Sequence, residues 1–385
     1  MQTNTLYQPT KHPEFALDSS FIHLNHAGTG PWPRRTTQAV TTFAQENLIL
    51  GSMHYPAWVK KETRLRQQLQ RLINAPQATD IALMKNTSEA LSTIAFGLNW
   101  QPGDNIVGIR QEFPSNRILW EALEQRFGVT FRQIDLKTTD DPETALSAAT
   151  DHKTRLVAVS AVQYANGFKL DLEKIGEFCH KQGILFSVDA IQQLGAMPFD
   201  VQAIQADFVC ADGHKWMLAP EGVALLYVKS NIREQLTLNQ FGWHMVEAIG
   251  DFDAPDWQPA GDARRFEAGS PNNLGIHALS ASLSLFEEVG IPQINEKIRD
   301  NIQHCIAHID RRQYILLSPT ASRRQSGIVT FAVPGHDSQS LYEQLMEHNV
   351  FCAPRGGGIR FSPHFYTPPE SIDEAFRILD NLCHA

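Results

Sequence analysis

The sequence predicts an α/β protein in which a largely parallel sheet is followed by a smaller α+β domain. Between about residues 80 and 230, short apolar runs alternate with amphipathic stretches, the pattern of strands connected by helices. The apolar residues in these runs are nearly continuous, as expected for parallel strands covered on both faces. With 385 residues the chain is long enough for two or three domains, and its pattern changes after about residue 230.

The predicted strands of the sheet are four apolar runs, at residues 106–109, 155–160, 184–190 and 207–211. Apolar residues recur at helical spacing over 171–182, and Gly183 follows at the point where a left-handed helix cap is favoured. We therefore expect this helix to be a right-handed crossover that enters the strand at 184–190.

The second half of the chain has a different pattern. Residues 241–271 are rich in Gly, Pro, Trp and Asp without a clear period, which predicts a long functional loop. Apolar residues then mark one face of a helix over 276–289, which Gly290 and Pro292 are expected to close.

A smaller α+β domain is predicted beyond that helix. Its expected elements are strands at 327–333, 350–353 and 358–362 and helices at 338–348 and 369–383. Thr367 and Glu370 form a T-x-x-E capping box with Pro368 at the first helical position. The predicted parts of the chain are an N-terminal arm (1–20), a large domain (21–245), an active-site loop region (246–275), and a linking helix with the small domain (276–385).

Composition excludes several classes of protein. The chain has 33 basic and 42 acidic side chains and a formal net charge of −9, so no bulk positive field attracts nucleic acid. Five cysteines without C-x-x-C spacing support neither a disulfide framework nor a zinc site. The N-terminus lacks the pattern of a secretory leader, and no apolar run reaches the roughly 18 residues of a membrane span. We expect a cytoplasmic protein without membrane contact.

The stretch ADGHKW places Lys215 directly after a predicted buried strand. In open α/β sheets ligands bind beyond the carboxyl ends of the strands, so Lys215 is expected in that crevice. A lysine that loses water there becomes less basic and can act as a Schiff-base nucleophile. A solvated loop lysine explains this stretch alone equally well.

Asp189 ends the preceding predicted strand, and one helix fits between it and Lys215. Two adjacent strands would then present a carboxylate and an amine at one edge of the sheet. A pyridinium cofactor needs that pair, with the carboxylate at its ring nitrogen and the amine at its aldehyde carbon. Taken alone, Asp189 is better explained as the cap of the following helix.

A third motif begins an apolar-periodic helix. Asn86, Thr87 and Ser88 precede the helix, and Glu89 completes an N-x-x-E box with Asn86. The free N–H groups and the dipole of such a helix start suit a phosphate. Simple helix capping explains the pattern equally well.

Taken in order, these motifs resemble the class V aminotransferase family of pyridoxal-phosphate enzymes, which includes cysteine desulfurases, isopenicillin N epimerase-like proteins and kynureninases. The resemblance extends from LNHAGTGPWP (24–33) through RFEAGSPN (265–272) to GGGIRFSPHFY (356–366). It implies fold type I, with a mainly parallel seven-stranded sheet in the large domain and a smaller α+β C-terminal domain.

The resemblance implies that the large domain holds pyridoxal 5′-phosphate. Lys215 would form the internal aldimine, Asp189 would pair with the pyridinium nitrogen, and Gln192 would reach the phenolic oxygen. Phe113 matches the residue that stacks on the ring, where similar desulfurases have His.

The cofactor's phosphate is expected among Thr87, Ser88, Asp212 and His214. Relatives whose turn reads S-x-H-K have Ser at the position of Asp212, whose carboxylate would repel a phosphate unless a cation or a proton intervenes. Ser270 matches a residue that the neighbouring subunit lends to the phosphate site, which implies a homodimer with shared active sites.

The substrate's carboxylate is expected at Arg360, because a guanidinium binds a planar carboxylate through two hydrogen bonds. The glycines at 356–358 let backbone approach a ligand there, and Arg355 is a weaker candidate. Asn25 and His26 lie in the segment that the family folds over the substrate, although His26 is equally explained as a structural histidine.

Two departures bear on the reaction. Desulfurases of this family carry a reactive cysteine on a long loop, where this chain has only GGGI between Arg355 and Arg360. Cys352 lies instead in an apolar run and is expected to be an inert core thiol. Ala161 stands where relatives often have Asn or His near the ring, and Gln163 is a candidate to supply the missing polar contact.

The resemblance therefore implies a cytoplasmic, homodimeric enzyme of aminotransferase, epimerase or C–S lyase type, acting on an amino acid through an external aldimine with Lys215 as general base. One alternative is a sulfur-mobilising enzyme like the cysteine desulfurases. An alternative of another class is a non-catalytic protein that keeps the fold to bind a ligand. A dinucleotide-binding oxidoreductase is disfavoured, because no G-x-G-x-x-G follows the first strands.

Overall fold

The computed structural model describes residues 12–384, and most of the predicted N-terminal arm lies outside the described residues. Its central element is the predicted seven-stranded sheet, in the order β2-β8-β7-β6-β5-β3-β4. The strands are β2 (Ile81–Met84), β3 (Asn105–Ile109), β4 (Thr130–Ile134), β5 (Thr154–Ser160), β6 (Leu185–Asp189), β7 (Phe208–Asp212) and β8 (Ala224–Val228). Only β8 runs antiparallel to its neighbours in this sheet, so the prediction of a mainly parallel sheet is confirmed.

Both faces of this sheet are buried. Along β5, Val157 and Val159 belong to one apolar cluster while Leu156 and Ala158 belong to another, because alternate side chains point to opposite faces. The helices that follow the strands are α3 (Thr87–Gly97), α4 (Ser115–Phe127), α5 (Pro142–Ala148), α6 (Leu172–Gln182) and α7 (Val201–Ile204). The near-continuous apolar runs of the sequence therefore reflect burial on two sides.

The predicted helix over 171–182 is α6, and Gly183 ends it with a φ of 69°, in the left-handed region. The structure places α6 between β5 and β6, which are adjacent and parallel. This agrees with the expected crossover connection.

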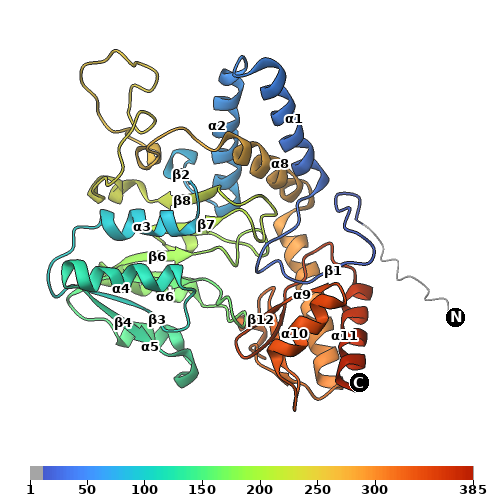
Figure 1. The fold of residues 1–385 in the computed structure, drawn as a ribbon. Helices are drawn as coiled ribbons and strands as arrows, with labels where there is room; N and C mark the ends of the chain where they lie inside the picture. Colours follow the sequence, from blue (N-terminus) through green and yellow to red (C-terminus); the bar gives the residue numbers. More distant parts are fainter. Residues whose placement is uncertain (1–11, 385) are drawn as a thin grey trace.

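A group of long helices lies beside one end of the sheet (Figure 1). Its members are α1 (Arg34–Leu50), α2 (Tyr55–Ile73) and α8 (Asn273–Val289). The side-chain amide of Gln68 on α2 donates a hydrogen bond to the Ser280 carbonyl of α8 at 3.1 Å. It also accepts a hydrogen bond from the Ser280 hydroxyl at 2.7 Å. The first helices of the chain are thus fastened to the helix that leads into the small domain.

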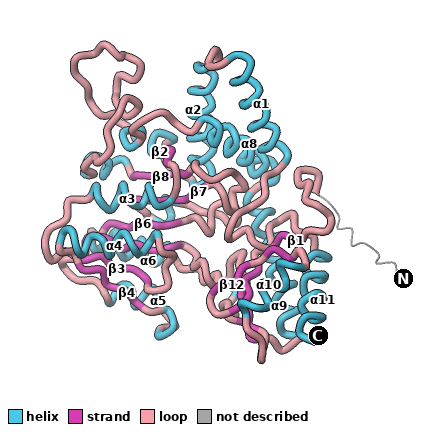
Figure 2. Tube along the Cα trace, in the orientation of Figure 1, coloured by secondary structure: helices cyan, strands magenta, loops and turns pink. Residues whose placement is uncertain are grey.

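The small domain contains a four-stranded sheet in the order β12-β13-β10-β9, with helices packed on it (Figure 2). Its elements are α9 (Ile291–Arg311), β9 (Ile315–Leu316), β10 (Val329–Ala332), α10 (Ser338–Glu347), β11 (Val350–Phe351), β12 (Ala353–Arg355), β13 (Gly358–Phe361) and α11 (Pro369–His384). β11 pairs in parallel with β1 (Ile22–His23), so the start of the described chain is joined to the small domain.

Three details of the small domain differ from the prediction. The helix over 276–289 is α8 and ends at Gly290 as predicted, but a 21-residue helix, α9, which the sequence analysis did not predict, begins immediately after Gly290 with Pro292 in its first turn. The predicted strand at 350–353 is divided between β11 and β12, which belong to different sheets. The capping box at Thr367 is not formed, because its hydroxyl accepts a hydrogen bond from the His364 N–H (2.9 Å) and the helix starts at Pro369.

Residues 241–262 form a long loop that projects from the molecule on the side away from the small domain (Figure 1). One isolated bridge, between Val246 and Pro259, ties its two sides together. The predicted long loop is therefore present. Among the described residues, no helix is long and apolar enough to cross a membrane.

Candidate active site

The site is built around an amine and a carboxylate at the carboxyl edge of the large sheet. β6 and β7 are neighbouring parallel strands, so Asp189 at the end of β6 lies on the same edge as the turn that carries Lys215. Burial lowers the pKa of Lys215 to about 8, against the opposing effect of Asp189. Burial raises the pKa of Asp189 to about 6. The structure therefore brings the predicted pair together in a setting that draws their pKa values towards each other.

The N-terminus of α3 contributes hydroxyl groups. Asn86 caps the helix by accepting the Glu89 N–H at 2.8 Å, and Glu89 in turn accepts the Lys85 N–H at 2.7 Å. Thr87 is buried and its hydroxyl has no hydrogen-bonding partner, while the Ser88 hydroxyl donates to Ser115 at 2.8 Å. The predicted helix cap is therefore formed, and the neighbouring Thr87 hydroxyl remains available to a ligand.

Asp212 and His214 lie beside Lys215. The Asp212 Oδ1 and His214 Nδ1 atoms are 3.0 Å apart, but their geometry does not make a hydrogen bond and both atoms are otherwise without partners. The His214 imidazole therefore stands next to the Asp212 carboxylate that would oppose a phosphate.

An aromatic ring faces the lysine. Phe113, which follows β3, is 42% exposed, and its ring centroid lies 5.4 Å from the Lys215 Nζ atom. Tyr164 stands edge-on against it with the ring centroids 5.2 Å apart. Phe113 therefore offers an exposed ring face beside the amine, on which a planar group could stack.

Arg360 on β13 is 3% exposed yet has no carboxylate partner among residues 12–384. It donates to the Tyr164 carbonyl at 2.7 Å and to Asn25 Oδ1 at 2.9 Å, and its Nε–H is unpaired. Burial, with a smaller effect of Arg355, lowers its pKa to about 10. A buried guanidinium with neutral partners and a free donor is prepared for an anion.

Two residues that were predicted to contact the cofactor or the substrate, Gln192 and His26, are hydrogen-bonded to other residues of the protein. Gln192 donates to the Ala27 carbonyl at 3.0 Å and accepts the Trp216 indole N–H at 2.8 Å, which leaves one amide hydrogen for a ligand. His26 is fully buried, with one ring nitrogen 2.8 Å from the Ser362 carbonyl and the other 2.6 Å from the Tyr366 hydroxyl. His26 offers no free nitrogen to a substrate, so the structural interpretation describes it better.

Ser270 lies apart from the cluster around Lys215. It lines a separate hollow of about 600 Å³ together with Lys85, Glu89 and Gly222. Lys215, Asp189 and Thr87 are not among the residues that line this hollow. The expected role of Ser270 depends on a neighbouring subunit and stays a prediction.

The sequence analysis missed Glu112. This buried carboxyl accepts the Ser160 N–H at 2.7 Å and the Gln163 amide at 3.1 Å, and it also contacts the Ser160 hydroxyl. Burial raises its pKa to about 7. These contacts tie Glu112, the residue before Phe113, to the end of β5. The sequence signal for Glu112 was its position just beyond the predicted strand at 106–109.

No cysteine lies in an exposed position at the site. Cys179, Cys210, Cys305 and Cys352 are buried, and Cys383 is half-buried near the end of α11. Burial raises the pKa of Cys352 to about 12. The connection from Arg355 to Gly358 is a tight hairpin turn, with φ of 61° and 83° at Gly356 and Gly357.

The N-terminal segment closes over the lysine turn. The Gly30 N–H donates to the His214 carbonyl at 2.8 Å, and a Cβ at position 30 would lie 2.4 Å from the Lys215 carbonyl oxygen. Only glycine permits this approach. Residues 24–30 therefore form one wall of the site.

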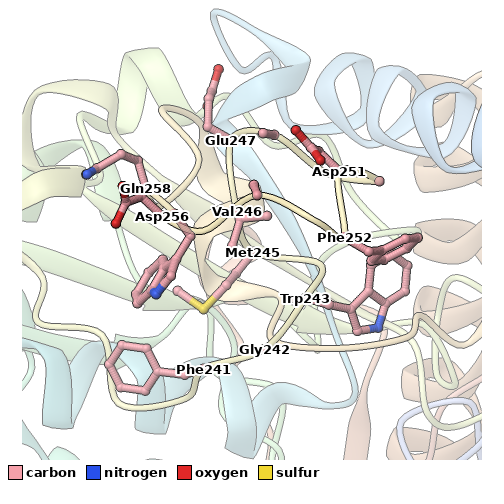
Figure 3. Close-up of a pocket in the computed structure, with 14 residues that line it drawn as sticks. Phe241, Gly242, Trp243, Met245, Val246, Glu247, Asp251, Phe252, Asp256 and Gln258 are labelled. Carbon is pink, nitrogen blue, oxygen red and sulfur yellow. The ribbon is translucent and has the colours of Figure 1, made fainter.

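A second hollow lies in the projecting loop. It measures about 720 Å³, and its walls include Phe241, Trp243, Phe252 and Trp257 (Figure 3). Lys215 and Asp189 are not among its walls. This apolar hollow is therefore separate from the amine and carboxylate pair.

These residues fit pyridoxal phosphate. The unpaired buried atoms at the site are Thr87 Oγ1, Gln163 Oε1, Asp212 Oδ1, His214 Nδ1 and Arg360 Nε, together with the partly neutralised Lys215 amine. Together these atoms could bind the aldehyde and the phosphate of the cofactor and the carboxylate of a substrate, and Asp189 could bind the ring nitrogen of the cofactor.

Comparisons with known proteins bear on the family and the fold. The family model described as aminotransferase class-V matches residues 22–367. A probable cysteine desulfurase of Methanothermobacter thermautotrophicus is 30% identical over 94% of both chains, and one of Pyrococcus abyssi is 29% identical over 96% of both. The solved structure of a C-DES mutant, with glycine covalently linked to its PLP cofactor, has a TM-score of 0.86 at 23% identity, covering 94% of this chain and 96% of that one.

Proposed function

Because this chain belongs to the class V aminotransferase family of pyridoxal-phosphate enzymes, we propose that it breaks the C–S bond of a sulfur-containing amino acid without storing the sulfur on a cysteine of its own. The buried pair of Lys215 and Asp189 is the observation that supports the cofactor assignment. The absence of an exposed cysteine at the described site supports the choice of reaction.

The cofactor, when bound, supplies an electron-withdrawing ring that acidifies the Cα–H bond of an amino acid. Lys215 Nζ would attach the cofactor and, once displaced by the substrate's amine, take the Cα proton. Its pKa of about 8 suits proton transfer near neutral pH. Asp189 would hold a proton on the ring nitrogen.

The remaining site residues would bind and orient. Thr87 and Ser88 at the start of α3, with His214 and the neighbouring Asp212, would hold the phosphate. Phe113 would cover one face of the ring. Arg360, held in place by Asn25 and the Tyr164 carbonyl, would bind the substrate's carboxylate.

The choice of C–S cleavage follows from the relatives and from the cysteines together. Each of the two relatives above is named a probable cysteine desulfurase. In this chain Cys352 is 1% exposed, and a two-residue turn replaces the long loop. Sulfur would then leave as a free thiol or sulfide, with the proton that Lys215 took from Cα available to it.

Transamination is the second candidate, and Phe113 favours it. Its ring carries no proton for a departing thiolate, whereas transamination needs only the lysine to move a proton. The products separate the two reactions, because C–S cleavage yields pyruvate, ammonia and sulfide from L-cysteine, and transamination converts the cofactor to its amine form.

We also propose a cytoplasmic homodimer in which Ser270 reaches the partner's phosphate site. Exposed apolar side chains at the end of α1 (Leu48 and Ile49) and in the projecting loop (Phe241, Phe252 and Trp257) support a subunit interface. Five free thiols suit a reducing compartment. Sedimentation of a single species with the mass of one chain would contradict the dimer.

The cofactor assignment is tested by borohydride reduction of the loaded protein and peptide mapping. The expected label is on the peptide that contains Lys215, and Lys215→Ala should remain colourless while Lys229→Ala labels normally. Loaded protein is then incubated with L-cysteine and L-cystine, and pyruvate, sulfide and protein persulfide are measured. Persulfide on the protein, or label on another lysine, would contradict the proposal.

A further inference from the structure

Two histidines one turn apart on α9 face an aspartate of α11. His304 and His308 are separated by four positions, which places both imidazoles on the same face of the helix. Asp373 belongs to α11, which packs against α9 in the small domain (Figure 1). The three side chains therefore connect the last helix of the chain to the first helix of the small domain.

The ring nitrogens of both histidines converge on one oxygen atom. Asp373 Oδ1 lies 2.7 Å from His304 Nε2 and 2.6 Å from His308 Nε2. The three possible ligand atoms all lie within 4.8 Å of one another. Ligands about 2.0–2.2 Å from a tetrahedral zinc ion are roughly 3.4 Å from one another, so side-chain shifts of about 1 Å would admit the ion.

The surroundings hold one ligand in place and leave the other two within reach of water. The His308 ring stacks on Phe376, with the ring centroids 4.8 Å apart and the planes 6° apart. The side chains of His304 and Asp373 are 32% and 50% exposed. An ion therefore has a path from solvent, and water can complete its coordination.

One cation stands next to these side chains, but an acid already neutralises it. Arg312 pairs with Asp380 through Nε at 2.7 Å and Nη2 at 2.6 Å. Its remaining nitrogen, Nη1, lies 2.8 Å from His308 Nδ1 and 3.3 Å from the His308 carbonyl oxygen. When His308 Nε2 binds a metal, Nδ1 carries the ring hydrogen and Nη1 keeps the carbonyl as its acceptor.

A second group of possible ligands, at Glu62, His244 and Glu267, suits a metal ion less well. Arg66 Nη2 donates to Glu267 at 2.9 Å and lies 3.6 Å from Glu62. The guanidinium therefore already supplies the positive charge that an ion would bring.

We propose that His304, His308 and Asp373 form a binding site for a divalent transition-metal ion such as zinc. Imidazole nitrogens suit such ions, whereas magnesium and calcium prefer oxygen ligands. The bound ion joins α9 to α11 and so stabilises the C-terminal helix on the small domain. This inference goes beyond the proposed function, because none of the three residues belongs to the candidate active site.

The test uses cofactor-loaded protein, freed of metal with EDTA, and calorimetric titration with zinc sulfate alone. The wild type should bind one zinc ion at this site, and zinc should raise the midpoint of thermal unfolding. His304→Ala and Asp373→Asn each remove one ligand and should weaken zinc binding at least about tenfold, since loss of even an outer partner of a metal ligand costs about 10–100-fold. Both side chains are partly exposed, so both variants should fold without zinc.

His348→Ala is the matched control, because His348 is an exposed histidine of the same domain whose Nδ1 contacts the Gln344 carbonyl of the preceding helix. The control should bind zinc as the wild type does. No zinc binding by the wild type, or equal affinity in the wild type and both ligand variants, would overturn the inference. An equal loss in the control would also overturn it, and each of these results leaves the proposed function intact.

Discussion

Two opposing effects act on the pKa of the Lys215 amine. Burial disfavours the ammonium, and Asp189 favours it, so the pKa is about 8 instead of a value near 10. The neutral amine is the form that attacks an aldehyde. A buried site can thus keep a nucleophile ready near neutral pH.

The rate at which apoenzyme takes up the cofactor should follow that amine. We expect the rate to rise with pH to a plateau, with a midpoint near 8, because the neutral fraction rises through the pKa. The lowered pKa also means that stability increases between about pH 8 and 10.5, where only the unfolded lysine retains its proton. Stopped-flow absorbance measures the uptake rate, and a pH-independent rate would contradict the assignment.

Asp189→Asn keeps the shape of the side chain and removes its charge. The variant should still bind cofactor but lose activity by roughly a thousandfold, as for other preorganised electrostatic contacts. Steady-state turnover and cofactor absorbance are measured together. Turnover within a few-fold of wild type would show that the ring nitrogen is not held by Asp189.

The predictability of single residues depended on distance along the chain. Lys215 and Asp189 were predicted because adjacent strands of one crossover fix their shared edge. The role of His26 was left open between a substrate contact and a structural histidine, because its partners Ser362 and Tyr366 are more than 300 positions away in sequence. Local pattern contains no information about such contacts.

At the scale of elements, one signal had two meanings. Gly290 ends α8 as predicted, but proline is also favoured in the first turn of a helix, and Pro292 lies in the first turn of α9, which the sequence analysis did not predict. The strand at 350–353 has the right polarity pattern, yet its two halves pair with different partners. Strand pairing is set by tertiary contacts that periodicity does not encode.

Cys352 lies between β11 and β12, in the joint between two sheets. Cys352→Ala should leave catalysis largely unchanged and lower the free energy of unfolding by about 1 kcal/mol through lost packing. Activity and urea denaturation are compared with Cys383→Ala, a half-buried control. Loss of activity in a folded, cofactor-loaded Cys352→Ala protein would restore the persulfide mechanism.

For the whole molecule, the large and small domains are joined by a buried ion pair. Glu143 of α5 lies 2.7 Å from Arg324 Nη2, and both residues are buried. Glu143 also accepts the Asp171 N–H at 2.8 Å, so the pair fixes the start of α6 as well. Such a contact fixes one point at which the small domain rests on the large domain.

Arg324→Ala should lower the free energy of unfolding by about 3 kcal/mol, because it leaves a buried carboxylate without its cation. Arg323→Ala is the control, since Arg323 is exposed and adjacent. Equilibrium denaturation measures both variants. Equal stabilities would mean that the carboxylate finds water or another donor at the domain boundary.

The pairing of β1 with β11 also affects how the chain is made. Ile22 emerges from the ribosome long before its partner Val350, so this pairing waits until synthesis is almost complete. Contacts so distant in sequence are costly to close and form late. The wall of the site that Gly30 builds against the Lys215 turn should therefore be among the last parts to assemble, and a nascent chain halted before residue 350 should leave the lysine open to solvent.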